Sequence, residues 1–591
     1  MFSKILSCVK NKKPTNQPTN RNGIKLLFIT ALTSFSSVAH DKFDLVLAGG
    51  ALKTCSSFMP QNCKNDPLFH DSKKQDLYKI SPESHARFRE ALSQWKKDNA
   101  VISQLHSSLE HIYAGGEGQA VSKNAFLDAL NAQGITNAEI SQLPDYVYFA
   151  LLDTHEVYQT DETGNRMREK VSIGDTSNPH SQDIYKAFVE QARVRAGGDT
   201  PMILVVTASA RDPFSVADFY TAIFTDLGAD TRWLPVSAAF QHAAFSQAQS
   251  GNGCEALAMS RKRVNVFDRE RLYPERTKQQ QLLCENPEKL LSLIDEAHGI
   301  FFNGGDQSKT LASLLHPDGS PSPLLKRIHS QVDKGALVVG GTSAGTAVQG
   351  GGVNNQRPIP MLSSGDPENA MGRGMFYLEP PSQRCDGTRC DNGLKSGDIT
   401  VNPAGGTGLF TYGLIDTHFS ERDRETRLIV ATLLSGQTLG FGVDETTALM
   451  VGKHDDGKVS FRVIGERGVF VADLAEHEWL EQQTEAAFVR QVGGHAHYWA
   501  SGTIATLQNG KWEIGLSGEP AKKATPIKNN YEGRWRREVG YKCGSDNMVS
   551  WTQFGNQYVV KAGDQTRFSA SEKHCSYQHL PFVIRYEADR H

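Results

Sequence analysis

The sequence has no acidic residue before Asp41, and its N-terminal apolar run, Leu26 to Phe35, is too short to span a bilayer. Six basic residues precede that run, and the small residues Ser37, Val38 and Ala39 follow it. A basic start, a short apolar centre and a small-residue end are typical of a secretory signal. We therefore expect residues 1–39 to be a signal peptide and the protein to be secreted or periplasmic. The alternative is a cytoplasmic protein with a basic tail.

The chain also lacks the positive charge that nucleic-acid binding requires. Its formal net charge is −3, and loss of the leader, with six basic residues and no acidic one, would change it to −9. Because phosphate backbones bind basic surfaces, we expect no nucleic-acid partner. The 39% hydrophobic and 22% charged residues are ordinary for a globular protein, which excludes a disordered chain or a membrane bundle. At 591 residues, the chain is too long for a single core.

No cysteine spacing is that of a zinc finger or a redox CxxC motif. Of nine cysteines, Cys8 lies in the leader, and the other eight fall into four sequence-local pairs. Eight cysteines allow 105 connectivities, so this pairing is a hypothesis. Disulfides are expected in an exported protein. The predicted pairs are Cys55 with Cys63, Cys254 with Cys284, Cys385 with Cys390, and Cys543 with Cys575.

Metal and cofactor motifs are weak. His495 and His497 lack a neighbouring carboxylate cluster in the sequence, so we expect surface histidines rather than metal ligands. His155 and Glu156 lack the second histidine of an HExxH motif and receive the same interpretation. The sequence therefore predicts neither a metal nor a cofactor. It predicts no membrane association after signal cleavage, and it is compatible with a homodimer.

Short apolar runs alternate with helical patterns along much of the chain. This alternation predicts an α/β fold, with a mostly parallel sheet and helices on both faces. One helical pattern runs from about Phe214 to Leu227 and stops at Gly228, where a glycine C-cap belongs. The apolar runs that we interpret as strands are Phe43 to Leu47, Met202 to Val206, Gly299 to Phe302, Ala336 to Val339 and Leu439 to Val443.

Two regions depart from this alternation. Residues 56–198 are rich in helical periodicity, for instance Pro82 to Tyr113 and Ser181 to Arg195, and we interpret them as a helical insertion. Residues 476–591 carry aromatic and β-branched runs and are interpreted as a β-rich C-terminal region. The predicted catalytic α/β domain then comprises residues 40–55 and 199–475.

The strongest local motif is GGTSAG at residues 340–345, directly after a predicted strand. A G-x-S-x-G sequence at a strand end is typical of a nucleophile elbow, in which a tight turn holds the serine hydroxyl away from the backbone. This pattern predicts Ser343 as the nucleophile. A glycine-rich turn that binds an anion is the alternative.

A serine nucleophile needs a base and an acid that orients the base. His418 follows the apolar segment Leu409 to Ile415, at a strand end where the sites of open α/β sheets gather. Asp444 and Glu445 end the strand Leu439 to Val443. Adjacent strand residues point to opposite faces, so only one of these acids can face the imidazole, and spacing alone leaves the choice open. The order serine, histidine, acid differs from that of ordinary α/β-hydrolases.

A glycine turn after the strand Gly299 to Phe302 offers the remaining element of such a site. Backbone N–H groups of Gly305 and Asp306, with that of Ala344, could form an oxyanion hole.

Four sequence blocks resemble those of the cyanophycinase group of serine peptidases, in the same order and at nearly the same spacing. The resemblance extends over about residues 43–51 and 202–474, which excludes the helical insertion. It implies a fold related to class I glutamine amidotransferases, with serine in place of their cysteine, and Glu445 as the triad acid. The blocks are FFNGGDQ (301–307), GGTSAG (340–345), DTHFSERDRETR (416–427) and GVDETTA (442–448).

The resemblance also implies a substrate. Cyanophycin is a polyaspartate that bears arginine on each side-chain carboxylate, and enzymes of the group release β-aspartyl-arginine dipeptides. Thr417 is also expected to contact substrate, but it stands where the group usually has glutamine, so selection of the substrate side chain is expected to differ. Arginine forks suit the binding of a substrate carboxylate. The positions that match the group's pocket are Gln307, Asp416, Arg422, Arg424 and Arg427.

Two other functions are compatible with these residues. A dipeptidase for aspartyl peptides would share the elbow and the triad but ignore the polymer. A catalytically silent secreted binding protein would keep only the fold. The intact triad argues against the second alternative.

Overall fold

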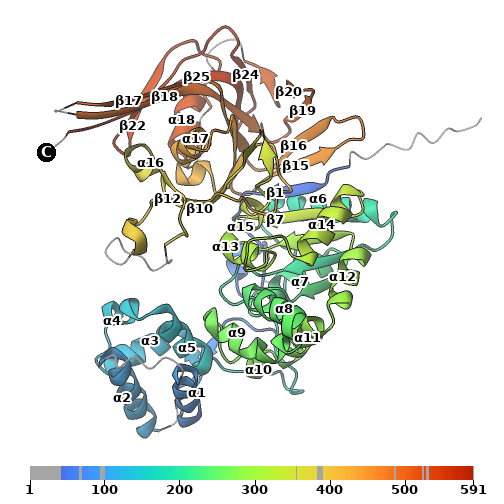
Figure 1. Ribbon diagram of the computed structural model, residues 1–591, viewed down its shortest axis with the longest axis vertical. Coiled ribbons are helices and arrows are strands. Elements are labelled where there is room, and N and C mark those ends of the chain that lie inside the picture. Colours follow the sequence, from blue (N-terminus) through green and yellow to red (C-terminus); the bar gives the residue numbers. More distant parts are fainter. Residues whose placement is uncertain are drawn as a thin grey trace, which may run out of the picture. The chain divides into compact units, whose positions relative to one another are not determined.

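The computed structural model describes residues 42–589 except 66–68, 94–99, 117, 355, 382–389, 485–486, 522–524 and 528–531 (Figure 1). The predicted signal peptide lies outside the described residues. Within them, no helix combines the length and the apolar character that crossing a membrane requires.

The first large sheet has nine strands and is mixed, where the sequence predicted a mostly parallel sheet. Its strands β1, β7, β6, β4 and β5 run parallel, whereas β15, β16, β19 and β20 pair antiparallel next to β1. In spatial order the strands are β20 (Lys511–Gly515), β19 (Ile504–Gln508), β16 (Val459–Gly465), β15 (Thr447–Lys453), β1 (Leu45–Ala48), β7 (Val338–Thr342), β6 (Gly299–Phe302), β4 (Met202–Val206) and β5 (Asp230–Leu234).

Helices cover both faces of this sheet, as predicted. Leu45 and Leu47 of β1 pack into one core, and their neighbours Val46 and Ala48 pack into another, because alternate strand residues point to opposite faces. On the first face lie α8 (Ala238–Ser250), α9 (Leu257–Arg263), α11 (Pro274–Glu285), α12 (Pro287–Glu296) and α14 (Pro323–Asp333), and on the second α6 (Pro179–Arg195) and α7 (Ala217–Asp226). Helix α7 ends just before Gly228, whose φ is +83°, in agreement with the predicted stop.

The segments that carry the candidate histidine and acid belong to a second sheet. Strands β13 (Leu414–Thr417) and β14 (Leu439–Val443) pair in parallel, and β14 pairs antiparallel with β17 (Gly468–Gln483). The sheet continues through β18 (Ala487–Ala500), β25 (Cys575–Asp589), β23 (Asn556–Val560) and β22 (Val549–Gln553), with β24 (Arg567–Ala570) and β21 (Glu519–Pro520) joined to it. Strand β17 crosses residue 475, so the β-rich region and the strands of the site share one sheet.

The two sheets share a hydrophobic core, in which Phe441 and Trp499 of the second sheet pack with Phe461 of the first. On the other face of the second sheet lie α17 (Glu425–Leu434), α18 (Arg534–Tyr541) and α16 (Pro367–Arg373). A separate three-stranded sheet has the strand order β10 (Met361–Ser364), β12 (Ile399–Asn402) and β11 (Met375–Phe376).

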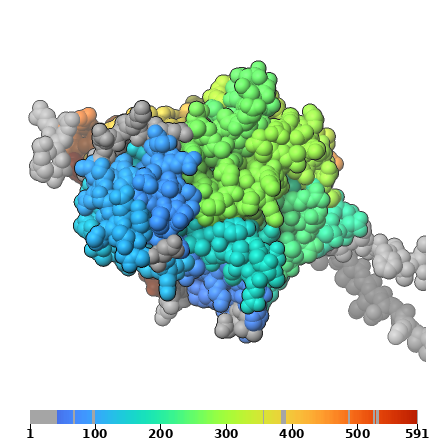
Figure 2. All heavy atoms as spheres, turned by 90° about the horizontal axis from the view of Figure 1, so that it is seen from below, coloured from blue at the N-terminus to red at the C-terminus, as the bar shows by residue number. Residues whose placement is uncertain are grey.

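The insertion is helical up to α5 and has its own core, which includes Phe88, Phe126 and Leu151. Its helices are α1 (Pro82–Leu92), α2 (Ala100–Ala114), α3 (Lys123–Ala132), α4 (Asn137–Gln142) and α5 (Asp145–His155). In Figure 2 the blue atoms of this region lie against green atoms of the α/β part.

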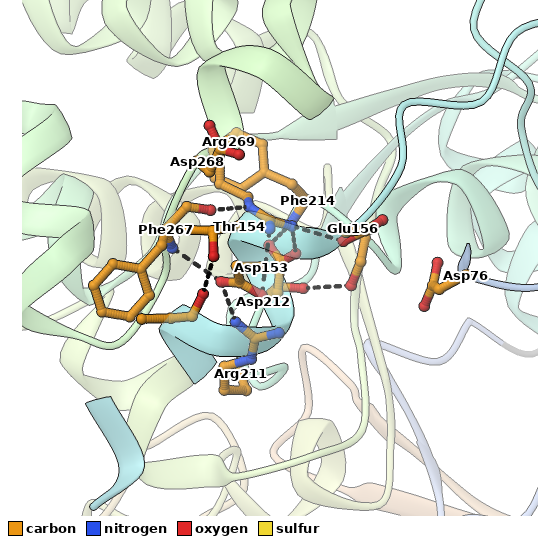
Figure 3. Close-up of polar contacts among 12 residues, drawn as sticks. Asp76, Asp153, Thr154, Glu156, Arg211, Asp212, Phe214, Phe267, Asp268 and Arg269 are labelled. Carbon is orange, nitrogen blue, oxygen red and sulfur yellow. Dashed lines mark hydrogen bonds and ion pairs between the residues drawn. The ribbon is translucent and has the colours of Figure 1, made fainter. Parts of the chain in front are cut away.

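A buried ionic cluster joins the insertion to the α/β part. Arg269, at the start of α10 (Arg269–Leu272), forms ion pairs with Asp153, Asp212 and Glu156 (Figure 3). Both His155 and Glu156 are buried, at 1% and 7% exposed, so the predicted surface position of this pair is wrong. The hydrophobic surroundings of α5 and the charge of Arg269 account for their burial.

Three of the four predicted disulfides are present: Cys55 with Cys63, Cys254 with Cys284, and Cys543 with Cys575. The fourth prediction includes Cys385, which lies outside the described residues. Each observed bond closes a short loop, because the pairs are 8, 30 and 32 residues apart.

Candidate active site

Ser343 occupies a strained turn between β7 and α15 (Ala344–Ala347). Its φ of 54° and ψ of −118° lie outside the regions that non-glycine residues favour. The turn needs glycine on both sides: a Cβ on Gly341 would lie 2.2 Å from the carbonyl oxygen of Gly345, and one on Gly345 would lie 2.1 Å from that of Phe302. The local geometry is therefore that of a nucleophile elbow.

His418 directly follows β13 and reaches the serine. Its Nε2 lies 2.7 Å from Ser343 Oγ. Its backbone N–H donates to the carbonyl of Gly49 at 2.8 Å, which fixes the residue against the end of β1. A Cβ on Gly50 would lie 2.4 Å from the imidazole, so only glycine leaves room for the ring. This requirement for Gly50 was not recognised from the sequence, because Gly50 and His418 are far apart in the chain.

The structure distinguishes the two adjacent acids. Glu445 faces the imidazole, with Oε1 2.7 Å from His418 Nδ1. Asp444 is fully buried on the other side of the strand end, where it accepts hydrogen bonds from the Tyr498 hydroxyl at 2.7 Å and the Ser420 N–H at 2.9 Å. The hydrogen bond from His418 lowers the pKa of Glu445 more than burial raises it, so this carboxylate stays charged.

A buried ionic network lies behind Glu445. The Glu445 N–H donates to Glu421 Oε2 at 2.8 Å, and Glu421 pairs with Arg467 at 2.8 Å and with Arg536 at 2.9 Å. Arg536 also pairs with Asp444 at 2.6 Å. Because Arg536 belongs to α18, the C-terminal region supports the loop that carries the acid. Sequence reasoning missed Glu421, Arg467 and Arg536, since successive members are 46 and 69 positions apart and no local motif links them.

A polar cavity of about 430 Å³ opens beside Ser343 and His418. All six residues predicted to bind substrate line it: Gln307, Asp416, Thr417, Arg422, Arg424 and Arg427. Residues that the sequence did not single out also line it, among them Ser364, Gly365, Asp366 and Gly397. Ser364 ends β10, and residues 365–366 join β10 to α16; no sequence motif could have identified this segment.

Asp416 and Arg427 form a buried pair in the wall of this cavity. Arg427 donates through Nε and Nη2 to the two oxygens of Asp416 at 2.9 and 2.8 Å, and its Nη1 donates to the Gly365 carbonyl. Arg424 donates to the Thr417 carbonyl at 2.6 Å. Burial acts to raise the pKa of Asp416, but the charges of Arg427 and Arg424 outweigh it, and the pKa lies below its ordinary value.

We expect Asp416→Asn to destabilise the protein near pH 6 by about 2–4 kcal/mol, because Arg427 then stays buried without its charged partner. A lowered carboxyl pKa stabilises the folded state above the ordinary value of about 3.9, and this stabilisation is lost as the pH falls through the folded value. The difference from the wild type should therefore shrink toward pH 3. Urea unfolding at both pH values measures it, and an equal difference at both would contradict the assignment.

The predicted oxyanion donors differ in their surroundings. Gly305 and Ala344 both line the cavity next to Ser343. The Asp306 N–H instead donates to the Ser209 carbonyl at 2.9 Å, and the Asp306 side chain accepts from the Ser308 N–H at 2.9 Å. The expectation that Asp306 is an oxyanion donor is therefore not supported, because its N–H is already paired.

An α/β core in which an elbow serine, a histidine and a carboxylate form a continuous chain of hydrogen bonds is the arrangement found in triad hydrolases. The sequence comparisons indicate which hydrolases this chain resembles. The chain is 28% identical to a cyanophycinase from Synechococcus elongatus over 279 residues, which are 47% of this chain and 61% of the relative. It is 25% identical to the cyanophycinase of Geminocystis herdmanii over 295 residues, 50% of this chain and 76% of the relative.

These matches confirm the resemblance to cyanophycinases, over about half of the chain. The first relative is matched over less than two thirds of its own length. No protein-family model matches the chain. A solved peptidase from an acI-B1 actinobacterium aligns with 49% of this chain and 84% of its own at 18% identity, but a TM-score of 0.27 supports no conclusion about the fold.

Proposed function

We propose that this protein is a secreted serine peptidase that hydrolyses cyanophycin to β-aspartyl-arginine dipeptides. The observation that carries the proposal is the chain of contacts from Glu445 through His418 to Ser343, with 2.7 Å at each step, beside a cavity lined by arginines. The similarity to cyanophycinases supports the choice of substrate.

In the proposed acylation, Ser343 Oγ attacks the scissile carbonyl carbon while His418 Nε2 takes the hydroxyl proton. The Glu445 carboxylate stabilises the imidazolium that forms. Backbone N–H groups of Gly305 and Ala344 would donate to the developing oxyanion, where a single donor contributes about 3–4 kcal/mol. When the tetrahedral intermediate collapses, the imidazolium gives its proton to the leaving amine, and an acyl ester on Ser343 remains.

Deacylation repeats these steps with water as the nucleophile. His418 takes a proton from water, the hydroxide adds to the ester carbonyl, and the Ser343 oxygen leaves as it regains the proton. The dipeptide carboxylate and the free enzyme are the products. The 15% exposure of the His418 side chain supports access of water to the ring.

The cavity chemistry supports a substrate that carries both carboxylates and guanidinium groups. Arg422 and Arg424 offer cationic groups to a substrate carboxylate. The Asp366 carboxylate, on the same cavity, offers a partner for an arginine side chain of the polymer. Gln307 donates through Nε2 to the Leu362 and Ser363 carbonyls at 2.8 and 3.0 Å, which fixes its amide at the rim.

The same proposal assigns domain boundaries and a cellular location to the protein. We keep residues 40–55 and 199–475 as the catalytic domain, 56–198 as an insertion and 476–591 as a β-rich region, with a core related to class I glutamine amidotransferases. Helix α6 of the insertion packs on the catalytic sheet, and β17 crosses the boundary at residue 475. The three disulfides support an oxidising compartment, and hence secretion or a periplasmic location.

The test is to incubate the purified protein with insoluble cyanophycin and to identify the soluble products by mass. We expect β-aspartyl-arginine as the main product. A parallel reaction offers short aspartyl peptides. If the polymer stays intact and the short peptides are cleaved, the protein is a dipeptidase. If neither substrate is cleaved, the peptidase proposal is overturned in favour of a binding protein.

A further inference from the structure

A second cluster of reactive side chains lies on the second sheet, on strands that carry no residue of the proposed triad. Asp473 of β17, His497 of β18 and His579 of β25 have one ligand atom each within 4.8 Å of one another. The three strands are neighbours in the sheet (Figure 1). The residues lie up to 106 positions apart in sequence, so only the strand pairing brings them together.

The strand register explains why these side chains share one face. Asp473 stands opposite His495, and Val471 stands opposite His497, so Asp473, His495 and His497 project from the same side. The pairing of β18 with β25 shifts between Ala496 and Tyr498. His579 lies in this irregularity with a φ of 50°, and such bulges re-aim a side chain.

The contacts within the cluster are poorly explained as hydrogen bonds. His497 Nε2 lies 3.6 Å from Asp473 Oδ2, which is long for a hydrogen bond. The other ring nitrogen of His497, Nδ1, is buried and has no hydrogen-bond partner within the described part of the chain, and the residue is 5% exposed. Because a buried polar atom normally has a hydrogen-bond partner, Nδ1 of His497 calls for an explanation.

A bound cation would account for the spacing. Two ligands that each lie about 2.0–2.1 Å from one tetrahedral Zn²⁺ are about 3.3 Å apart, which is close to the separation of His497 and Asp473. The His497 and His579 ring centroids are 4.8 Å apart, so small side-chain rotations would bring the third ligand into range. His495, whose ring centroid lies 6.1 Å from that of His579, is available for a fourth position.

We propose that Asp473, His497 and His579 form a structural zinc site that ties β17, β18 and β25 together, with His495 as the fourth ligand. Two or three imidazoles and one carboxylate suit Zn²⁺, whereas Mg²⁺ and Ca²⁺ prefer oxygen ligands. His497 is buried, at 5% exposed, so its expected position on the surface is wrong, whereas His495 is partly buried. No carboxylate cluster lies near these histidines in the sequence, but Asp473 of β17 lies beside them in the folded protein. The proposal does not depend on the hydrolytic activity.

The test uses the full-length protein without a histidine tag, stripped with a chelator and titrated with ZnCl₂ by calorimetry. We expect one zinc ion per chain and a rise in the melting temperature with Zn²⁺ but not with Mg²⁺, because a bound ion stabilises the folded state by mass action. His497→Asn and His579→Asn should each weaken binding at least about tenfold.

His106→Asn is the matched control, because His106 Nδ1 lies 2.8 Å from His85 Nε2 in a close histidine pair outside the three-ligand cluster, with Glu110 Oε1 4.0 Å from His85 Nδ1. This variant should bind zinc like the parent. Unchanged binding in His497→Asn and His579→Asn would overturn the proposal, as would loss of binding in His106→Asn alone.

Should the histidine variants fail to fold, the parent protein still tests the assignment. Co²⁺ in a tetrahedral site of nitrogen and oxygen ligands gives intense visible absorption bands, whereas octahedral Co²⁺ gives weak ones. A stoichiometric intense spectrum that Zn²⁺ displaces supports the site, and its absence excludes it.

Discussion

Replacement of Ser343 by alanine is expected to lower the release of dipeptide from cyanophycin by at least about 10⁴-fold, while the fold stays intact. The Ser343 hydroxyl would form the acyl ester, and His418 Nε2 lies 2.7 Å from it. Alanine is close to serine in size and would have to adopt the same backbone conformation at this turn. We therefore expect an unchanged circular dichroism spectrum and an unchanged melting temperature within a few degrees.

The matched control is Ser308→Ala. Ser308 is on α13 (Gln307–Ala312), next to Gln307, but it does not line the cavity beside Ser343. This variant should keep most of the activity, so a loss specific to Ser343 would identify the nucleophile. Dipeptide release that survives in Ser343→Ala would exclude the serine mechanism. The measurement is the initial rate of product formation at saturating substrate, with the products identified by mass.

The adjacent acids Asp444 and Glu445 are expected to respond in opposite ways to amide substitution. Glu445→Gln should lower the hydrolysis rate by about 10³–10⁴-fold, because the amide no longer stabilises the imidazolium or holds the ring in its tautomer. The side chain is 23% exposed, so the unfolding midpoint should change little. The loss should therefore be one of activity.

Asp444→Asn should instead lower stability by about 3 kcal/mol or more, because Arg536 stays buried with one of its two carboxylate partners neutral. The activity of the molecules that remain folded should fall far less than in Glu445→Gln. Urea unfolding and initial rates, measured on both variants, separate the two effects. A large activity loss in Asp444→Asn, with full activity in Glu445→Gln, would show that the structure assigns the acids wrongly.

Much of the α/β fold could be predicted because its elements are encoded locally. The strands at Met202–Val206 and Gly299–Phe302 coincide with the predicted runs, and Gly228 ends α7 as expected. The pairing of the strands was harder to predict from the sequence. The strand Leu439–Val443 exists as predicted, but it joins a second sheet, because β15 occupies the edge next to β1. A run of apolar residues is compatible with either position.

Some residues of the candidate site could likewise be predicted from local sequence, and others could not. The elbow around Ser343 and the histidine after β13 could be predicted, since each depends on a few consecutive residues. The donor role of Asp306 was not supported, because its N–H pairs with Ser209, a residue almost 100 positions earlier. The supports Glu421, Arg467 and Arg536 could not have been found, because no local pattern links them.

Local sequence specifies which chemical groups are present and which backbone turns they occupy. Glycines beside Ser343 permit one tight turn, and cysteines close in the chain formed three disulfides. Strand pairing and packing place Glu445 rather than Asp444 against the imidazole, and bring Asp473 close to His497 and His579. Local conformation depends on near neighbours, whereas the meeting of distant side chains depends on how strands pair and pack.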